Sequence, residues 1–304
     1  MIDQLELVPD SERRGLIGAL PASARPYASL MRLDRPIGAW LLFWPGAWAV
    51  ALAGIDRHGV AVILWLGLGA FAMRSAGCVY NDIVDRDLDR QVERTRLRPL
   101  ASGRASLRGA IALLVALSLV GLIVLLQLRP LAQIVALASL LLVAIYPFMK
   151  RITWWPQLWL GLVFTWSALV GWAEATNSLS AAGLLLYAGS VIWAVGYDTI
   201  YALQDREDDA LVGVKSSALA LGDRARTGVA MLYALAVLLW GGAIWIVRPD
   251  PLAFAALLPM ALHLGRQVAT LRQDDPGDAL AKFRANRFAG LLMFLGCLVV
   301  GSAA

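Results

Sequence analysis

Residues 109–128 read GAIALLVALSLVGLIVLLQL, a run without a charged side chain. About 20 mostly apolar residues are needed to cross the hydrocarbon core of a bilayer as a helix. Because lipid offers the backbone no hydrogen-bonding partner, a membrane segment is either a helix or one strand of a closed barrel. The run lacks the alternation of apolar and polar residues that barrel strands require. It therefore predicts a transmembrane helix, and with it an all-α membrane protein.

Eight further segments share this character. Together with the first they give nine expected spans, at 37–54, 60–80, 109–128, 130–148, 155–173, 181–201, 226–247, 251–271 and 287–303. The composition agrees, since 59% of the 304 residues are hydrophobic and only 16% are charged. No linker rich in Pro, Ser or Gly interrupts the spans, so we predict one polytopic membrane domain over residues 36–304. Residues 1–35 lack the apolar core of a signal peptide and predict a cytosolic arm.

Basic residues are distributed unevenly between the loops, and cytoplasmic loops usually carry the excess of Lys and Arg. With the N-terminus in the cytoplasm, only Arg57, Arg129 and Arg248 fall on the opposite side, and Arg74 lies inside a span. This asymmetry predicts nine spans with the N-terminus inside. It also explains the net charge of +5 without a nucleic-acid partner, because no soluble segment forms a basic face with stacking aromatics. The two cysteines and two histidines are too scattered for a disulfide framework or a zinc site.

An acidic cluster follows the second span, where residues 81–89 read NDIVDRDLD. If the helix continues past the membrane edge, Asn81, Asp85 and Asp89 recur at i, i+4 and i+8 on one face. Mg²⁺ prefers oxygen ligands and commonly combines one or two carboxylates with phosphate oxygens and waters. The alternative is a solvated loop in which the interleaved arginines pair with the acids.

A second cluster follows the sixth span and weakens the alternative of a solvated loop. Residues 198–209 read DTIYALQDREDD and place Asp198, Tyr201, Asp205 and Asp209 at helical spacings. Both clusters lie on the predicted cytoplasmic side, where two acidic faces require a cation to neutralise them. Mg²⁺ bound to a diphosphate meets that requirement. Arginines of the first loop offer two alternatives, covering the acids without metal or contacting lipid headgroups; they are Arg94, Arg96, Arg98 and Arg104.

At these residues the chain resembles the UbiA superfamily of intramembrane prenyltransferases. The NDxxDxxxD signature of that superfamily is matched by Asn81, Asp82, Asp85 and Asp89. Its second motif, DxxxD, resembles Asp205 and Asp209, with Glu207 at a position where an aspartate is common. The stretches similar to the branch that prenylates 4-hydroxybenzoate are 32–38, 74–82, 94–100, 146–151, 197–202 and 213–216.

The resemblance implies nine helices around a central cavity and a Mg²⁺-dependent reaction. That reaction transfers a polyprenyl group from polyprenyl diphosphate to the ring carbon ortho to the hydroxyl of 4-hydroxybenzoate, in ubiquinone biosynthesis. The implied metal ligands are Asn81, Asp82, Asp85, Asp89, Asp198, Asp205 and Asp209. The residues expected to act in catalysis are Asp85, Asp205, Arg74, Arg151 and Tyr201. The implied location is a bacterial-type inner membrane, with the active site facing the cytoplasm.

The two substrates need different partners in the protein. An arginine fork suits the acceptor carboxylate, and the candidates are Arg74 and Arg151. Candidates for the diphosphate are Arg32 and Lys150. The stretches similar to the family add Arg94, Arg98 and Lys215 as expected substrate-binding residues. An allylic cation can rest against aromatic faces, for which the candidates are Tyr146, Tyr197 and Tyr201.

Two other functions fit parts of the pattern. A related prenyltransferase with another aromatic acceptor would keep both acidic motifs, although the stretches 74–80 and 197–202 argue against it. A cation-coupled transporter also has many spans and buried acids, but transporters place them near the bilayer midplane. Here the acids lie at predicted helix ends, and Arg74 is the main exception. The length of the prenyl chain and the oligomeric state stay open.

Overall fold

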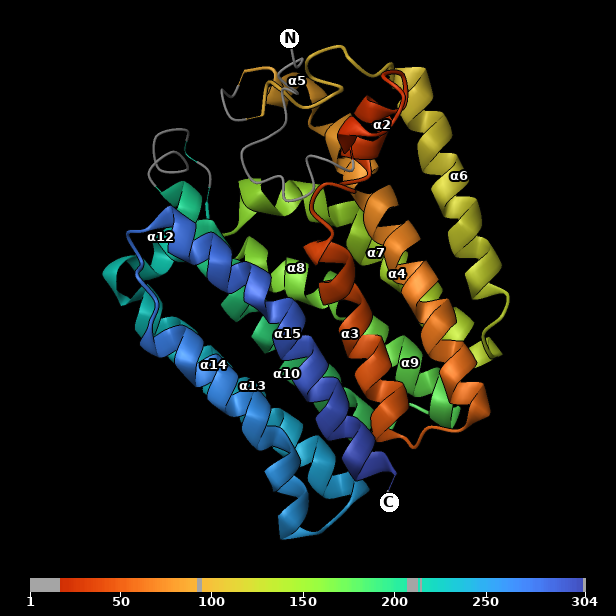
Figure 1. Cartoon of the computed structure of the whole chain (residues 1–304), viewed down its shortest axis with the longest axis vertical. Coiled ribbons are helices and arrows are strands. Elements are labelled where there is room, and N and C mark those ends of the chain that lie inside the picture. The colour runs from red at the N-terminus through yellow and green to blue at the C-terminus, as the bar shows by residue number, and fades with distance from the viewer. Residues whose placement is uncertain (1–16, 92–94, 207–212, 214, 303–304) are drawn as a thin grey trace. The chain divides into compact units, whose positions relative to one another are not determined.

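The computed structural model describes residues 17–91, 95–206, 213 and 215–302 (Figure 1). Within these residues every regular element is an α-helix or a short 3-10 helix, and no strand occurs. The predicted all-α class is confirmed. Contacts divide the chain into two compact units, called here the first unit (Met1–Trp40 with Gly67–Leu125) and the second unit (Leu41–Leu66 with Leu126–Ala304).

The first unit holds the first acidic cluster. Its helices are α2 (Arg25–Leu30), the part of α4 (Arg57–Val84) from Gly67 onward, α5 (Arg86–Asp89) and α6 (Leu107–Leu125). The helices α4 and α6 lie side by side (Figure 1) and share an apolar core with α2, to which Leu30, Val79 and Leu117 contribute. This core fixes the position of the end of α4, where the acidic residues follow.

The second unit is larger and holds the second acidic cluster. Its elements are most of α3 (Ile37–Leu52), the start of α4, α7 (Pro130–Ile152), α8 (Pro156–Phe164), α9 (Ser167–Thr176), α10 (Ala181–Ala202), η1 (Leu203–Asp205), α12 (Ser217–Leu221), η2 (Gly222–Arg224), α13 (Ala225–Val247), η3 (Pro251–Leu257), α14 (Leu258–Ala269) and α15 (Pro276–Gly301). Helix α10 is largely buried and packs against α8, α13 and α15.

Three fully buried tryptophans, Trp48, Trp193 and Trp240, form the centre of the second unit. Their rings lie 5.1 to 6.3 Å apart, as tilted or edge-to-face pairs. Because a buried indole N–H needs an acceptor, the Trp193 N–H donates to Asn286 Oδ1 at 3.0 Å and the Trp48 N–H donates to the Gly290 carbonyl at 2.8 Å. These bonds connect α3 and α10 to α15.

The described helices include eight that are long and apolar enough to cross a membrane. They confirm a multi-pass membrane protein. Helix α3, the first predicted span, has 16 residues and is shorter than the other eight. The count of nine spans, the cytoplasmic N-terminus and the division at residue 35 stay predictions.

The largest difference from the expected spans concerns the last helix. The prediction begins this span at residue 287, whereas α15 begins at Pro276. Asp275 caps its N-terminus by accepting a hydrogen bond from the Asp278 N–H, and Pro276 suits the first turn. The early turns carry charged residues, so apolar content alone does not reveal them.

Candidate active site

The first acidic cluster continues the helical course of α4. The Asp85 N–H donates to the Asn81 carbonyl at 2.9 Å, and the Asp89 N–H donates to the Asp85 carbonyl at 2.8 Å. Three carboxylates are buried, and we call them the acidic row: Asp82 is 1% exposed, Asp85 0% and Asp89 5%. The chain therefore keeps helical hydrogen bonds through the cluster after α4 ends at Val84, while its position relative to the membrane edge stays a prediction.

Asp87 behaves differently from the acidic row. Its side chain is 81% exposed and lies 3.2 Å from Arg90 and 3.5 Å from Arg86. The interpretation of the cluster as a solvated, ion-paired loop therefore holds for Asp87. It does not hold for the buried carboxylates beside it.

Two arginines expected to bind substrate contact the acidic row. Arg32 Nη2 lies 2.7 Å from Asp82 Oδ1, and Arg98 Nη1 lies 3.3 Å from the same oxygen and 2.9 Å from Asp89 Oδ2. Arg98 thus covers the acids, as one of the alternatives from the sequence proposes. Arg94 lies outside the described residues.

The grouping of the acids differs from the expected i, i+4, i+8 face. Arg98 joins Asp82 to Asp89, which are seven residues apart. Seven residues of an α-helix return to within about 20° of the starting direction, whereas eight residues end about 80° away. Asp89 therefore shares a partner with Asp82, which is not a member of the expected face of Asn81, Asp85 and Asp89.

Burial and neighbouring charges shift the pKa values of residues in this network in opposite directions. Burial alone would lower the pKa of Arg32, but the carboxylate of Asp82, together with smaller contributions from Cys78 and Asp34, raises that pKa above its usual value. Burial raises the pKa of the Asp89 carboxyl above its ordinary value, although Arg98 acts in the opposite direction. A cation near Asp89 would therefore be favoured, because it stabilises a carboxylate that is costly to bury.

Arg74 lies on α4, seven residues before Asn81, as the sequence predicts. Its Nε and Nη1 atoms are buried and have no hydrogen-bond partner among the described residues. The guanidinium fits there because residue 38 is a glycine: a Cβ at this position would lie 2.5 Å from Arg74 Nε. A buried guanidinium with unpaired donors is suited to bind a carboxylate or a phosphate.

The second acidic cluster begins on α10 and continues into a 3-10 turn. Asp198 lies within α10, and Asp205 ends η1. Because the chain tightens after Ala202, the regular α-helical face expected as far as Asp209 is interrupted. Asp209 itself lies outside the described residues, as do Glu207 and Asp208.

Aromatic rings line the same part of the second unit. The Tyr201 ring lies 4.5 Å from that of Phe283, and the Tyr197 ring lies 4.8 Å from Trp193 and 5.9 Å from Phe283. The Tyr197 hydroxyl is buried and has no hydrogen-bond partner among the described residues. Phe283 is absent from the predicted site because it belongs to the early turns of α15, which the sequence analysis places outside the last span.

The remaining predicted residues lie at or near the end of α7. The Lys215 ammonium donates to the Ile152 carbonyl at 3.3 Å and lies 5.7 Å from the centre of the Trp154 ring. Tyr146 is half-buried on α7. Lys150 and Arg151 belong to the same helix, but their side chains lie outside the described part.

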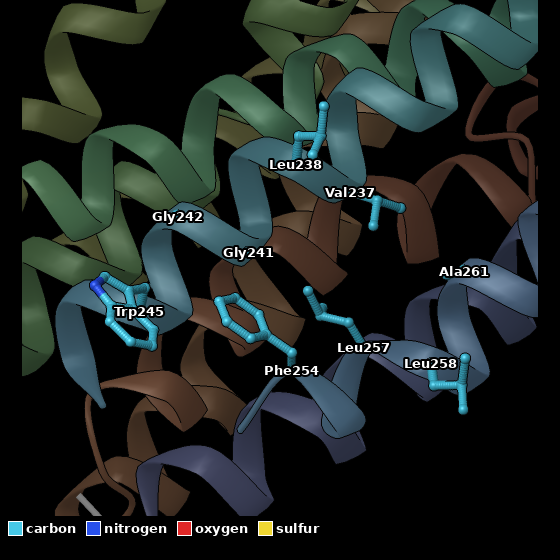
Figure 2. Close-up of a pocket in the computed structure, with 9 residues that line it drawn as sticks. All are labelled: Val237, Leu238, Gly241, Gly242, Trp245, Phe254, Leu257, Leu258 and Ala261. Atoms are coloured by element: carbon cyan, nitrogen blue, oxygen red, sulfur yellow. The ribbon is translucent and has the colours of Figure 1, made fainter. Parts of the chain in front are cut away.

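A pocket of about 500 Å³ lies elsewhere, between α13, η3 and α14 (Figure 2). Its lining is apolar and includes Trp245 and Phe254, whose rings are stacked 5.7 Å apart. It contains none of the predicted site residues.

Within the described part of the chain, no group of three or more His, Cys, Asp or Glu side chains is arranged to hold a metal ion. A Mg²⁺ ion at the acidic clusters would therefore need further ligands, which Mg²⁺ commonly takes from phosphate and water.

Comparison with known proteins places this geometry in a family. The model of the UbiA prenyltransferase family matches residues 42–298. The mitochondrial 4-hydroxybenzoate polyprenyltransferase of Drosophila melanogaster is 45% identical over 287 residues, which cover 93% of this chain and 73% of that protein. An apo UbiA homologue from Aeropyrum pernix K1 matches with a TM-score of 0.70 at 26% identity, covering 86% of this chain and 97% of the other. A UbiA homologue from Archaeoglobus fulgidus bound to GPP and Mg²⁺ shares the fold, with a TM-score of 0.62 at 18% identity over 92% of this chain and all of the other. The chain therefore belongs to the UbiA prenyltransferase family.

Proposed function

We propose that this protein transfers a polyprenyl group from polyprenyl diphosphate to the ring carbon ortho to the hydroxyl of 4-hydroxybenzoate, in ubiquinone biosynthesis. The observation that carries the proposal is the presence, in the first unit, of both the buried acidic row and Arg74, whose buried Nε and Nη1 atoms have no hydrogen-bond partner among the described residues. The acids suit a cation, and the arginine suits an anionic acceptor. The similarity to 4-hydroxybenzoate polyprenyltransferases supports the choice of substrates.

Mg²⁺ is the proposed cofactor. The candidate ligands offer only carboxylate and amide oxygens, which is the donor set that Mg²⁺ prefers, and Asp85 is fully buried. We assign metal binding to Asn81, Asp85 and Asp89 in the first cluster and to Asp198, Asp205 and Asp209 in the second. When bound, Mg²⁺ supplies positive charge that stabilises the departing diphosphate.

Basic side chains of the protein hold the two substrates. We assign the acceptor carboxylate to Arg74, because its buried donors lack a partner among the described residues, while Arg151 stays the second candidate. The diphosphate is assigned to Arg32, Arg94, Arg98, Lys150 and Lys215. This division leaves one arginine for the acceptor and several cations for the more highly charged donor.

Aromatic side chains protect the reactive end of the prenyl group. Departure of the diphosphate leaves an allylic cation, which water would capture and which aromatic faces stabilise. We assign this role to Tyr197 and Tyr201, with Phe283 packed against both rings. Tyr146 is a further candidate. The prenyl tail itself is apolar and extends into the bilayer.

The proposed location is a bacterial-type inner membrane with the reaction on the cytoplasmic side. The cytoplasmic side is supported by the asymmetry of Lys and Arg between the predicted loops. A second enzymatic reading, a related enzyme with another aromatic acceptor, differs only in the acceptor that is prenylated.

A membrane assay with labelled 4-hydroxybenzoate and a polyprenyl diphosphate tests the function. We expect prenylated product with Mg²⁺ and none with EDTA, while related aromatic acceptors are not prenylated. The variants Asp85→Ala and Asp205→Ala should insert normally and lose turnover, whereas Asp87→Ala, changed at an exposed acid, should retain it. Absence of Mg²⁺-dependent product from the wild type would refute the proposal, and activity in either of the first two variants would remove that acid from the metal site.

A further inference from the structure

Asp82 belongs to the NDxxDxxxD signature, yet two guanidinium groups contact its carboxylate. Arg32 Nη2 and Arg98 Nη1 lie 2.7 and 3.3 Å from the same oxygen, Oδ1. The side chain of Asp82 is 1% exposed, and those of Arg32 and Arg98 are 10% and 21% exposed. Ion pairs this deeply buried are screened little by salt, so they fix the arginines more firmly than surface pairs would.

The backbone of Arg32 adds an independent observation. Its φ is 58°, in the left-handed region that non-glycine residues seldom adopt. Such a conformation persists only where the surroundings enforce it. Helix α4 does so twice, because Ser75 Oγ donates to the Met31 carbonyl at 3.2 Å and Asp82 accepts from Arg32. The turn before α3 is therefore built to direct Arg32 toward Asp82.

Helical spacing separates Asp82 from Asn81 and Asp85. Ser75 and Asp82 lie seven residues apart on α4 and share a direction, whereas Asn81 points about 100° away and Asp85 follows the end of α4. A divalent cation bound at Asp82 Oδ1 would lie close to two positive groups and be repelled. Oδ2 of Asp82 is buried without a hydrogen-bond partner among the described residues, which is the one feature that favours a metal there. Two guanidinium groups already compensate this carboxylate.

We propose that Asp82 is a positioning residue that orients Arg32 and Arg98 toward the diphosphate of the substrate, and that it does not bind the metal. A guanidinium carries five N–H donors, so an arginine held by one carboxylate oxygen keeps donors for phosphate oxygens. The inference rests on the proposed function, because it takes the diphosphate as ligand. The acids of the NDxxDxxxD signature then have two tasks: Asp85 and Asp89 bind the metal, and Asp82 orients the arginines.

The test compares Asp82→Asn with Asp85→Asn in the full-length protein in nanodiscs. Binding of Mn²⁺ alone is followed by electron paramagnetic resonance, and binding of inorganic pyrophosphate by calorimetry. We expect Asp82→Asn to keep the Mn²⁺ affinity of the wild type and to weaken pyrophosphate binding by about tenfold, the scale of one charge-assisted hydrogen bond. Asp85→Asn should lose Mn²⁺ binding.

Loss of Asp82 alone leaves a buried arginine without its partner and can impair folding. The double variant Asp82→Asn/Arg32→Gln removes both charges and should restore the thermal midpoint. Its pyrophosphate affinity should lie at or below that of Arg32→Gln with Asp82 intact, because Asp82 also orients Arg98. Rescue of pyrophosphate binding together with folding would mean a purely structural role and overturn the inference.

Two further results would also overturn it: loss of Mn²⁺ binding in Asp82→Asn to the level of Asp85→Asn, or unchanged pyrophosphate binding. Neither measurement requires the acceptor. If the wild type fails to prenylate 4-hydroxybenzoate but the binding results are as expected, the proposed function fails and the role of Asp82 stands.

Discussion

At the scale of single residues, Arg74 has room for its guanidinium because residue 38 lacks a side chain. A Cβ on Gly38 would lie 2.5 Å from Arg74 Nε and 2.8 Å from Nη2, so Gly38→Ala must displace the arginine. Displacement of a binding group by about 1 Å can cost on the order of a hundredfold in rate. We expect kcat/KM for 4-hydroxybenzoate to fall by about that factor, with a smaller effect on the KM for the prenyl diphosphate.

Gly77→Ala is the matched control for this prediction. Gly77 also lies in α4, but nothing lies within 4 Å of a Cβ at that position. Alanine favours a helix over glycine by about 1 kcal/mol, so this variant should be stable and fully active. Equal activity of the two variants, measured in the same membranes, would show that Arg74 does not bind the acceptor.

Residue spacing predicts some of these positions and misses others. The heptad between Arg74 and Asn81 predicts an arginine directed into the protein, and its Nε and Nη1 atoms are indeed buried, without a hydrogen-bond partner in the described part of the chain. The contact between Arg32 and Asp82 spans 50 residues, and no local pattern contains it. A face built from every fourth residue also misses the relation of Asp82 to Asp89. Four residues turn the helix by about 40° more than a full turn, so such a face drifts around the helix with each step.

At the scale of helices, Glu174 connects three elements of the second unit. It lies on α9 with 0% exposure and accepts from the Arg129 backbone N–H at 2.6 Å, at the start of α7. His58, at the start of α4, lies 3.1 Å away on the other carboxylate oxygen. Glu174→Ala should lower the stability by about 1–3 kcal/mol, because it removes a charge-assisted hydrogen bond from the Arg129 N–H.

Thermal unfolding in detergent measures this effect. The control is Asp87→Asn, which removes an exposed ion pair and should change the stability by less than about 1 kcal/mol. Glu174 lies outside the acidic clusters, so the folded fraction of Glu174→Ala should keep the catalytic constants of the wild type. An unchanged midpoint would mean that water replaces the carboxylate without cost.

Helix boundaries follow from the sequence only where the apolar content changes at the boundary. The expected span 181–201 agrees with α10 (Ala181–Ala202), because polar residues flank an apolar run. In α15 the charged Lys282 and Asp278 pair with each other at 2.6 Å inside the helix, so its first turns look like a loop. For this reason the site predicted from the sequence does not include Phe283. The cap at Asp275 and Pro276 is the local signal that identifies the true start.

At the scale of the whole molecule, the side of the membrane on which the N-terminus lies depends on α3. With 16 residues and a rise of about 1.5 Å per residue, this helix is shorter than the hydrocarbon core of about 30 Å. A short span can still cross where the bilayer thins around it, at a modest cost. The excess of Lys and Arg in the predicted cytoplasmic loops favours crossing, because otherwise the N-terminal arginines and those of residues 86–108 would face opposite sides.

Single-cysteine labelling in intact cells measures the outcome. In a background with Cys78 and Cys297 replaced by serine, we test Ser23→Cys, Arg57→Cys and Arg104→Cys, each at an exposed position. If α3 crosses, an impermeant thiol reagent labels only the variant at residue 57, and inverted vesicles show the reverse. If α3 does not cross, residues 23 and 57 react on the same side. That result would exclude nine spans and place the N-terminal arm opposite the first acidic cluster, although Arg32 and Asp82 lie in contact. The buried ion pair between Arg32 and Asp82 therefore supports the crossing of α3 independently of the distribution of Lys and Arg.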